Sequence, residues 1–537
     1  MKKKMSCIEK RSIICLFMVM VMFFVASFRI MTVMTKENYS AAATRQNTYR
    51  LTVTRQRGTI FDTNMKSLTN GVKKTYTAVM PTDEGKNTMS KYLSLAEMKE
   101  LSKELSSGKP VLIETEGEVK GEGTESITVS VNDKQSTLAV HLLGYVDSSG
   151  HGMSGLQRAF DDILYSDSTV DFLYARDARG NILSRFETKT SSNESIESSG
   201  IKTTIDMDIQ KLTEEAAAEL ISGAVVVSEV GTGKIRALVS KPTFDPSNIS
   251  QYLNDGTSPL INRAFCAYNV GSVFKPCVAA AALEQDVYST LMYECTGSKE
   301  IATKSFACHK SSGHGLIGLN DALAFSCNTF FYTIGQKIGA TAVYDMYSSL
   351  MFGQEHIFCK GLSTEKGNMP QLNEIEASEQ ALANTVIGQG SVMLTPVSLL
   401  TLYEAIANGG EYHKPMLIEG VVKNGVVSEE KQSEAVRVMS RKTAATIKEA
   451  LCDVVAKGTG QAARPKSCTA AGKTATAQTG WIINEKSVNH SWFCGFFPAD
   501  DPQYVAVIIS ENTNGGGTAC PPIFSRLADA VYTLKLS

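Results

Sequence analysis

An uncharged apolar run near the N-terminus restricts the fold of this chain more than any other feature of its sequence. From Ser12 to Phe28 the residues are SIICLFMVMVMFFVASF, and Ile30 to Met34 prolong the run beyond Arg29. About 17 apolar residues are the shortest stretch that crosses a bilayer as a helix. The run therefore predicts one transmembrane helix over residues 12–34, preceded by a short tail of residues 1–11.

The charges beside this run predict its orientation. Five basic residues precede the run and two follow it closely: Lys2, Lys3, Lys4, Lys10 and Arg11 before it, and Arg29 and Lys36 after it. Because positive charge is retained on the cytoplasmic side, the N-terminus is predicted in the cytoplasm and the remaining chain outside the plasma membrane. A cleaved signal peptide is the alternative, but its site at Ala41–Ala43 lies well beyond the apolar run.

Composition excludes several other classes of protein. The chain has 537 residues, enough for three or four domains at about 150 residues each. Apolar residues make up 43% and charged residues 20%, which is ordinary globular usage and not that of a disordered chain. Lys and Arg number 53 against 55 Asp and Glu, so the overall charge predicts no nucleic-acid partner.

The cysteines are concentrated in the part predicted to lie outside the membrane. Ten of the twelve lie between Cys266 and Cys520, and their spacing matches neither a zinc ribbon nor a CxxC redox pair. Buried free thiols are the favoured interpretation, and a disulfide between Cys295 and Cys308 is the alternative. None of the seven histidines is predicted to lie in a ligand-like cluster, and no metal or cofactor is expected.

Two short signals stand out before residue 200. The segment Arg57–Asp62 reads as a strand leading into an Asx turn, and Gly152–Gln157 precedes an apolar helical pattern. The following stretch 187–200, ETKTSSNESIESSG, is polar and rich in serine. Such a stretch marks an exposed loop, and a domain boundary is therefore predicted at about residue 200.

Beyond this boundary the pattern is that of a mixed α and β domain. Ala224–Val227 and Ile235–Val239 flank a glycine turn and predict a hairpin, and His490–Phe497 with Tyr504–Ser510 predict a second one. Apolar residues from Ile523 to Leu534 then recur at helical spacing. Strands at both ends with helices between them predict one antiparallel sheet that the termini of the domain complete.

A serine and a lysine three residues apart are the first candidates for chemistry. Ser272 and Lys275 precede the helix-forming run Val278–Leu283, so hydroxyl and amine share one face of a helical turn. There the lysine can take the serine proton, and the helix N-terminus directs N–H groups at the attacked group. The same spacing recurs at Ser106–Lys109 and Ser428–Lys431, so this pair alone is weak evidence.

Two later motifs strengthen the interpretation. Ser326-Cys327-Asn328 follows the helical segment 319–325, and Lys473-Thr474-Ala475-Thr476-Ala477 begins a β-compatible run. The order SxxK, SxN, KT in these settings is typical of serine acyl transfer. For Ser326 and Asn328 taken alone, a helix cap is the alternative.

With these elements the chain resembles the class B penicillin-binding proteins, the bacterial peptidoglycan D,D-transpeptidases, from the predicted anchor to the C-terminus. Further motifs carry the resemblance: Arg57–Asp62, Gly155–Phe160, Thr204–Asp206, Asn262–Ala264, Gly388–Gly390, Leu394–Pro396, Gly458–Gly460 and His490–Phe493. The resemblance implies an α+β fold, the penicillin-recognising serine transpeptidase fold with an antiparallel sheet flanked by helices, over residues 201–537. An extended mixed α/β pedestal or dimerisation-like domain without catalytic residues is implied for residues 35–200.

The resemblance also implies roles for the motif residues. Ser272 would attack the carbonyl between the two terminal D-alanines of a stem peptide, with Lys275 as the base. Ser326 would relay a proton to the leaving amine, and Asn328 would hold the stem-peptide amide.

The resemblance implies that the motif Lys473–Ala477 binds the substrate. Thr474 and Thr476 would hold the terminal carboxylate beside the charge of Lys473, and the N–H groups of Ser272 and Thr476 would form the oxyanion hole. The family has glycine where this chain has Ala475, which removes no catalytic group. Because side chains alternate along a strand, Ala475 shares the face of Lys473, and its methyl group is predicted to face the nucleophile.

The implied partners are peptidoglycan stem peptides and lipid-linked precursor strands, with β-lactams as inhibitors. A membrane glycan polymerase and other wall-synthesis proteins would work beside the enzyme, in cell division, cell-shape maintenance or sporulation. Two alternatives stay open: a catalytically impaired scaffold of a wall-synthesis complex, suggested by Ala475, or a D,D-carboxypeptidase.

Overall fold

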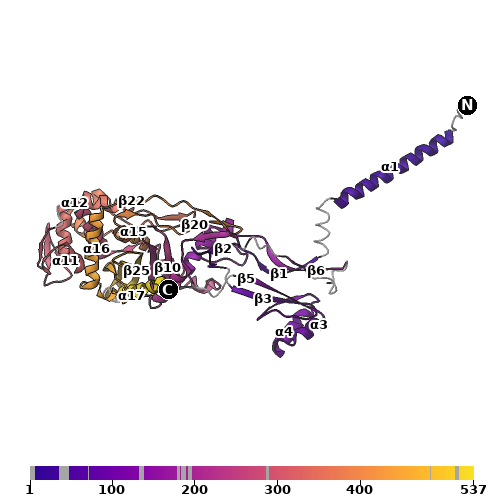
Figure 1. The fold of residues 1–537 in the computed structure, drawn as a ribbon, viewed down its shortest axis with the longest axis horizontal. Coiled ribbons are helices and arrows are strands. Elements are labelled where there is room, and N and C mark those ends of the chain that lie inside the picture. The colour runs from indigo at the N-terminus through magenta and orange to yellow at the C-terminus, as the bar shows by residue number, and fades with distance from the viewer. Residues whose placement is uncertain are drawn as a thin grey trace. The chain divides into compact units, whose positions relative to one another are not determined.

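The chain forms two compact units in the computed structural model shown in Figure 1. The structure describes residues 7–35, 48–69, 72–131, 138–177, 182, 189–191, 196, 198–285, 290–483, 485–513 and 519–536. The first unit comprises residues 1–56, 72–131 and 167–193, and the second comprises 57–71, 132–166 and 194–537. The alternative cleavage site at 41–43 and half of the predicted boundary stretch 187–200 lie outside the described residues.

Helix α1 (Cys7–Thr35) covers the apolar run near the N-terminus. Its segment Cys7–Thr32 has a mean hydropathy of 2.5, and no part of that segment is buried against the rest of the chain. At about 1.5 Å per residue such a helix is long enough to cross a bilayer, as predicted for residues 12–34. It is the indigo helix in Figure 1.

The first unit also contains two small sheets and two helices. One sheet has the order β4-β3-β5 and the other β1-β6-β7. The elements are β1 (Thr48–Arg55), β3 (Val72–Val79), α3 (Asp83–Met89), α4 (Leu95–Leu105), β4 (Val111–Thr115), β5 (Thr124–Val131), β6 (Thr169–Ala175) and β7 (Lys189–Ser191). Helix α4 begins with a capping box of Ser94 and Glu97 and buries Leu101 and Leu105 against Val79.

The second unit is built around a five-stranded antiparallel sheet in the order β10-β9-β25-β24-β23. Its strands are β9 (Gly223–Glu229), β10 (Ile235–Lys241), β23 (Ala471–Ile483), β24 (Lys486–Phe497) and β25 (Tyr504–Thr513). Both predicted hairpins are present, and β25 pairs with β9 so that Val507 lies opposite Val226. The prediction of one sheet completed by both ends of the domain is confirmed.

Helices cover both faces of this sheet, which explains its apolar strands. Because side chains alternate along a strand, Val225 and Val227 point to one core and Ala224 and Val226 to the other. The first core is closed by α9 (Met207–Ala216) and α17 (Cys520–Leu536), and the second by α10 (Lys275–Leu283), α15 (Pro396–Ala407) and α16 (Arg441–Ala456). Every residue of α10 is buried.

Further strands and helices belong to the second unit, the longest of them a helix of 22 residues that begins at Asn328. They are β11 (Tyr268–Asn269), β12 (Tyr293–Cys295), β13 (Ser298–Ile301), β14 (Lys304–Ala307), β15 (Gly315–Ile317), α11 (Leu319–Ala324), α12 (Asn328–Ser349), β16 (Ile357–Cys359), β17 (Leu362–Ser363), α13 (Leu372–Glu376), α14 (Glu379–Val386), β18 (Met393–Leu394), β19 (Glu411–Tyr412), β20 (Ile418–Lys423), β21 (Val426–Glu429) and β22 (Val436–Arg437).

Segments from before residue 200 also belong to the second unit. Strand β2 (Thr59–Phe61) pairs in parallel with β8 (Gly200–Thr203), beside β20. Asp62 then accepts backbone hydrogen bonds from Asn64 and Lys66, so the predicted Asx turn is confirmed.

The two motifs that precede residue 200 meet through a buried arginine. Arg57 donates to Gln157 Oε1 at 2.7 Å and lies 2.8 Å from an Asp161 carboxylate oxygen. Gln157 lies on α6 (Gly155–Ala159), and Asp161 begins α7 (Asp161–Leu164). The helical pattern predicted after residue 157 is present as α7, but helix already begins within the motif as α6, against which α5 (Val140–Leu143) packs.

Candidate active site

Ser272 lies on a 3-10 turn, Gly271–Phe274, that leads directly into α10. The sequence predicted that Ser272 lies at the start of a helix. In the structure the helix is preceded by this tighter turn, and Ser272 lies on the turn. Gly271 has φ of 60° and its N–H donates to Gly388 O at 2.8 Å. A Cβ on Gly388 would lie 2.2 Å from Gly271 O, so these two glycines allow a close backbone approach that holds the turn in place.

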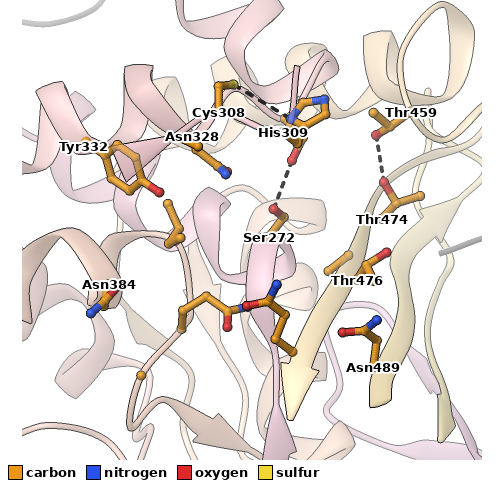
Figure 2. A pocket seen from close by; sticks show the side chains of 17 residues that line it. Ser272, Cys308, His309, Asn328, Tyr332, Asn384, Thr459, Thr474, Thr476 and Asn489 are labelled. Carbon is orange, nitrogen blue, oxygen red and sulfur yellow. Dashed lines mark hydrogen bonds between the residues drawn. The ribbon is translucent and has the colours of Figure 1, made fainter. Parts of the chain in front are cut away.

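A chain of hydrogen bonds joins Ser272 to three other motif residues, and the dashed line at Ser272 in Figure 2 marks the first of these bonds. Ser326 Oγ donates to Ser272 Oγ at 3.0 Å. Lys275 Nζ donates to Ser326 O at 2.8 Å, to Ser326 Oγ at 3.2 Å and to Asn328 Oδ1 at 2.7 Å. These three acceptors satisfy the three donors of an ammonium group.

The segment around Ser326 is a turn rather than a simple helix cap. Ser326 has φ of 56°, in the left-handed region that a non-glycine residue rarely adopts. Helix α12 begins at Asn328, with Cys327 at the N-cap and no side-chain cap hydrogen bond. Ser326 and Asn328 instead direct their side chains to Lys275, so the helix-cap alternative is wrong for them.

Burial changes the acid–base properties of both site lysines. Burial lowers the pKa of Lys275 to about 7, because its charged form has lost contact with water. Burial also lowers the pKa of Lys473 well below its usual value, and the charge of Lys275 lowers it further. Lys473 Nζ donates to Thr474 O at 3.1 Å. Both amines therefore lie in the layer beneath the pocket surface.

Strand β23 borders the pocket as the edge of the sheet. Ala475 lies opposite Trp492 on β24, and both side chains belong to the core that contains α10. Trp492 Nε1 donates to Asn269 O at 2.9 Å, just before the turn that carries Ser272. The methyl group of Ala475 therefore faces the nucleophile turn, as alternation along the strand predicted. Thr474 shares a hydrogen bond of 2.7 Å with Thr459.

These residues surround one pocket of about 840 Å³. The predicted residues Ser272, Ser326, Asn328, Thr474, Ala475 and Thr476 all line it. Several further polar side chains that the sequence did not single out also line it: His309, Tyr332, Asn384, Gln478 and Asn489. Gln389 and Thr459, from the motifs at 388–390 and 458–460, line it as well. Gln478 continues the alternation of Thr474 and Thr476 along β23, and Asn489 lies opposite it on β24, so strand spacing could have indicated both.

One expectation about the cysteines and histidines is wrong. Cys295, Cys308, Cys327 and His314 place their ligand atoms within 4.8 Å of one another, so His314 does lie in a ligand-like cluster. Cys295 and Cys308 have free thiols and form no disulfide. The cluster borders the pocket, because Cys308 lines the pocket and Cys327 is the middle residue of the Ser326–Asn328 turn.

The architecture is shared with solved penicillin-binding proteins. Penicillin-binding protein 3 of Mycobacterium tuberculosis aligns with a TM-score of 0.65 at 23% identity, over 91% of this chain and 97% of that one. A complex between the penicillin-binding protein PBP2 and MreC of Helicobacter pylori contains a chain with a TM-score of 0.65 at 19% identity, over 91% of this chain and 99% of that one. The fold is therefore that of the penicillin-recognising serine enzymes.

Residues 223–529 match the family described as the penicillin binding protein transpeptidase domain. Stage V sporulation protein D of Bacillus subtilis is 30% identical over 414 residues, which are 72% of this chain and 61% of the relative. The peptidoglycan D,D-transpeptidase MrdA of Acinetobacter baumannii is 26% identical over 423 residues, which are again 72% of this chain and 61% of the relative. The chain belongs to the penicillin-binding protein transpeptidase family, with class B members among its relatives. It spans about three fifths of the length of these relatives.

Proposed function

We propose that this protein is a serine D,D-transpeptidase that cross-links peptidoglycan stem peptides and that β-lactams acylate. The observation that carries the proposal is the hydrogen-bond chain from Ser272 through Ser326 to Lys275 at the floor of a polar pocket. Relatives such as the Acinetobacter MrdA are named for this activity.

The first half-reaction forms an acyl-enzyme. Ser272 Oγ attacks the carbonyl carbon between the two terminal D-alanines, and its proton passes through the Ser326 hydroxyl to neutral Lys275. The lowered pKa of Lys275 leaves a large neutral fraction of this amine near neutral pH. The C–N bond then breaks, the leaving amine takes a proton back by the same path, and free D-alanine departs.

The second half-reaction transfers the acyl group. An amine of a neighbouring stem peptide attacks the ester carbonyl, loses a proton to the same Ser326–Lys275 path, and forms the cross-linking amide. The Ser272 hydroxyl is restored. Neutral Lys275 is again the base, so one buried amine serves both steps.

The edge of the sheet supports the substrate part of the proposal. Among the residues that the structure describes, β23 is paired on one side only, with β24, so its other edge can pair with an extended peptide. Thr474 and Thr476 on this strand supply hydroxyls for a terminal carboxylate, and Lys473 supplies nearby positive charge when it is protonated. The N–H groups of Ser272 and Thr476 form the oxyanion hole in this proposal.

Membrane attachment completes the proposal. Helix α1 anchors the chain in the plasma membrane, with the N-terminus in the cytoplasm and the pocket on the outer side, where peptidoglycan is assembled. A membrane glycan polymerase and other wall-synthesis proteins are the proposed partners. The Helicobacter PBP2 complex with MreC is one such assembly of a protein with this fold.

The test uses the full chain in detergent with a synthetic stem peptide that ends in D-Ala-D-Ala. A transpeptidase is labelled by fluorescent penicillin, releases D-alanine, and makes cross-linked product when an acceptor amine is added. Release of D-alanine with only the shortened peptide as product would favour a carboxypeptidase. No labelling and no release would favour a scaffold. Ser272→Ala is the matched control for all three readouts.

A further inference from the structure

Four polar side chains of the pocket that the proposed function leaves unassigned have no hydrogen-bond partner among the residues that the structure describes. They are the hydroxyl of Tyr332 and the carboxamides of Asn384, Gln389 and Gln478. Tyr332 is 4% exposed, yet its hydroxyl points into the pocket on the side of Asn328 (Figure 2). Burial raises the pKa of Tyr332 to about 12, so this hydroxyl stays protonated. Because a buried hydroxyl without a protein partner is costly, Tyr332 indicates a ligand that supplies the missing hydrogen bond.

Two helices and the loop after the second one form one wall of the pocket. Asn328 and Tyr332 are four residues apart on α12, so they share a face of that helix. Helix α14 packs against α12. Asn384 lies near the end of α14, and its carbonyl oxygen accepts the N–H of Gln389 at 2.9 Å. This wall therefore carries a hydroxyl and two carboxamides besides Asn328.

Strands β23 and β24 form the facing wall. Gln478 follows Thr474 and Thr476 at alternate positions of β23, so the three side chains share a face. Asn489 lies opposite Gln478 on β24. In Figure 2 the side chains of Thr476 and Asn489 lie across the pocket from those of α12 and α14. Both walls therefore present neutral hydrogen-bonding groups.

The pocket lining is uncharged apart from one imidazole. Among the described residues that line it, none is Asp, Glu, Lys or Arg. The imidazole, His309, lies at the other end of the pocket from Asn384 and Asn489 (Figure 2). Lys275 and Lys473 lie beneath the surface and donate to protein oxygens. This region therefore offers hydrogen bonds without a cation beside them.

The substrate geometry of the proposed function directs the donor peptide into this region. In that geometry the terminal carboxylate lies at Thr474 and Thr476, and the scissile carbonyl lies at the N–H of Thr476. The peptide then runs antiparallel to β23, with the residues before the scissile bond toward Gln478. An extended peptide and a strand both advance about 3.3 Å per residue, so the residue before the two D-alanines lies near Gln478.

We propose that the four side chains without a protein partner form a subsite for the residue that precedes the two D-alanines of the donor stem peptide. The subsite selects an uncharged, amide-bearing side chain over a carboxylate, and this inference rests on the proposed function. A carboxamide donates and accepts hydrogen bonds, as the phenol and carboxamides of the walls do. A carboxylate loses its water there and meets no cation in the described walls, which is costly.

The first test compares two donor peptides on the full chain in detergent. Both are N-acetylated and end in D-Ala-D-Ala, and the preceding residue is L-glutamine in one and L-glutamate in the other. The kcat/KM for release of D-alanine is expected to be at least about tenfold higher for the glutamine peptide. Equal values, or a preference for the glutamate peptide, would overturn the subsite.

Penicillin labelling of the same preparation separates failure of this inference from failure of the proposed function. Labelling at Ser272 with release of D-alanine, but with no preference between the peptides, overturns the inference alone. Without labelling, or without release from either peptide, the proposed function fails and the subsite fails with it.

The second test adds a charge to the subsite. Gln478→Lys places an ammonium group at an exposed position of the strand, where the fold tolerates it. The kcat/KM for the glutamine peptide divided by that for the glutamate peptide is expected to fall by at least about tenfold. Gln251→Lys adds the same charge at an exposed position that is not among the described pocket residues, and it leaves the ratio unchanged. An unchanged ratio in Gln478→Lys, or equal falls in both variants, would overturn the placement of the donor peptide.

The third test removes the buried hydroxyl. Tyr332→Phe is expected to lower kcat/KM for the glutamine peptide by at least about tenfold, because the peptide loses a hydrogen bond in a desolvated site. Tyr344→Phe on the same helix is the matched control, since Tyr344 is not among the described residues that line the pocket, and it keeps the parent value. Thermal unfolding checks that both variants are folded. A parent-like kcat/KM in folded Tyr332→Phe would overturn the role of this hydroxyl.

Discussion

The hydroxyl of Ser326 lies 3.0 Å from the hydroxyl of Ser272, and Lys275 contacts Ser326 rather than Ser272 in the hydrogen bonds of the described residues. The lysine amine therefore reaches the nucleophile through a second hydroxyl. Lys275 is also fully buried, so its charge has no solvent to stabilise it. We therefore expect the rate of acylation to be limited by deprotonation of the Lys275 amine rather than by the distance between this amine and Ser272.

Replacement of the nucleophile is the simplest prediction. Ser272→Ala is expected to abolish covalent penicillin binding and to change the free energy of unfolding by less than about 1 kcal/mol, because only one hydroxyl is removed. Intact-mass spectrometry and thermal unfolding measure the two effects. An adduct on the variant, or one mapped to Ser106 or Ser428, would refute the assignment of Ser272.

The acylation rate is expected to rise with pH through about 7. The pKa of Lys275 is lowered to about 7, so the amine is protonated below that value and neutral above it. Since only the neutral amine accepts a proton, the second-order rate constant for penicillin should increase about tenfold per pH unit below the pKa and level off above it. A rate independent of pH across this range would contradict the role of Lys275 as base.

An acidic substitution beside Lys275 is expected to move this profile. Asn328 Oδ1 lies 2.7 Å from Lys275 Nζ, so Asn328→Asp places a negative charge next to the amine. That charge favours the protonated lysine and should shift the midpoint upward by at least about one pH unit. Asn384→Asp is the matched control, because Asn384 lines the same pocket without a hydrogen bond to Lys275 among the described residues. Equal shifts in both variants would show that the effect is not local.

Ala475 provides a test of packing at the strand. Its side chain is 4% exposed and shares a face with Trp492 beside the nucleophile turn. Ala475→Gly is expected to change the penicillin acylation rate by less than about tenfold, since the site already accommodates the methyl group. Ala475→Val adds two methyl groups to a packed face and should be much slower. A valine variant as fast as the parent would show that this face does not meet the nucleophile.

Membrane orientation has a direct test. If basic residues hold the N-terminus in the cytoplasm, protease added to intact protoplasts should digest the chain beyond Lys36. An epitope at the extreme N-terminus should remain protected until the membrane is permeabilised. Protection of the pocket-bearing unit in intact protoplasts would exclude the proposed orientation.

Local patterns in the sequence predicted much of this protein. The length of the apolar run near the N-terminus predicted α1, and the β-rich runs with their turn residues predicted both hairpins. The order of the three motifs SxxK, SxN and KT predicted the residues that line the pocket beside Ser272. The helix and the hairpins depend on neighbours within a few residues, whereas the pocket residues were predicted from the order of three motifs along the chain. Side-chain alternation also predicted that Ala475 faces the nucleophile turn.

Other features depend on contacts between residues far apart in the chain. Tyr332 and Asn384 reach the pocket from helices whose packing no local pattern specifies. Cys295, Cys308, His314 and Cys327 are separated by 13, 6 and 13 residues, and only the pairing of β12 with β15 and the β13–β14 hairpin place their ligand atoms together. The sequence by itself determined the periodic elements, because these follow from short-range backbone preferences, and it identified the motif residues by their types and their order along the chain. Tertiary structure alone decided the metal-ligand cluster and the buried state of Lys275, because ligand distances and desolvation arise only when separate elements pack together.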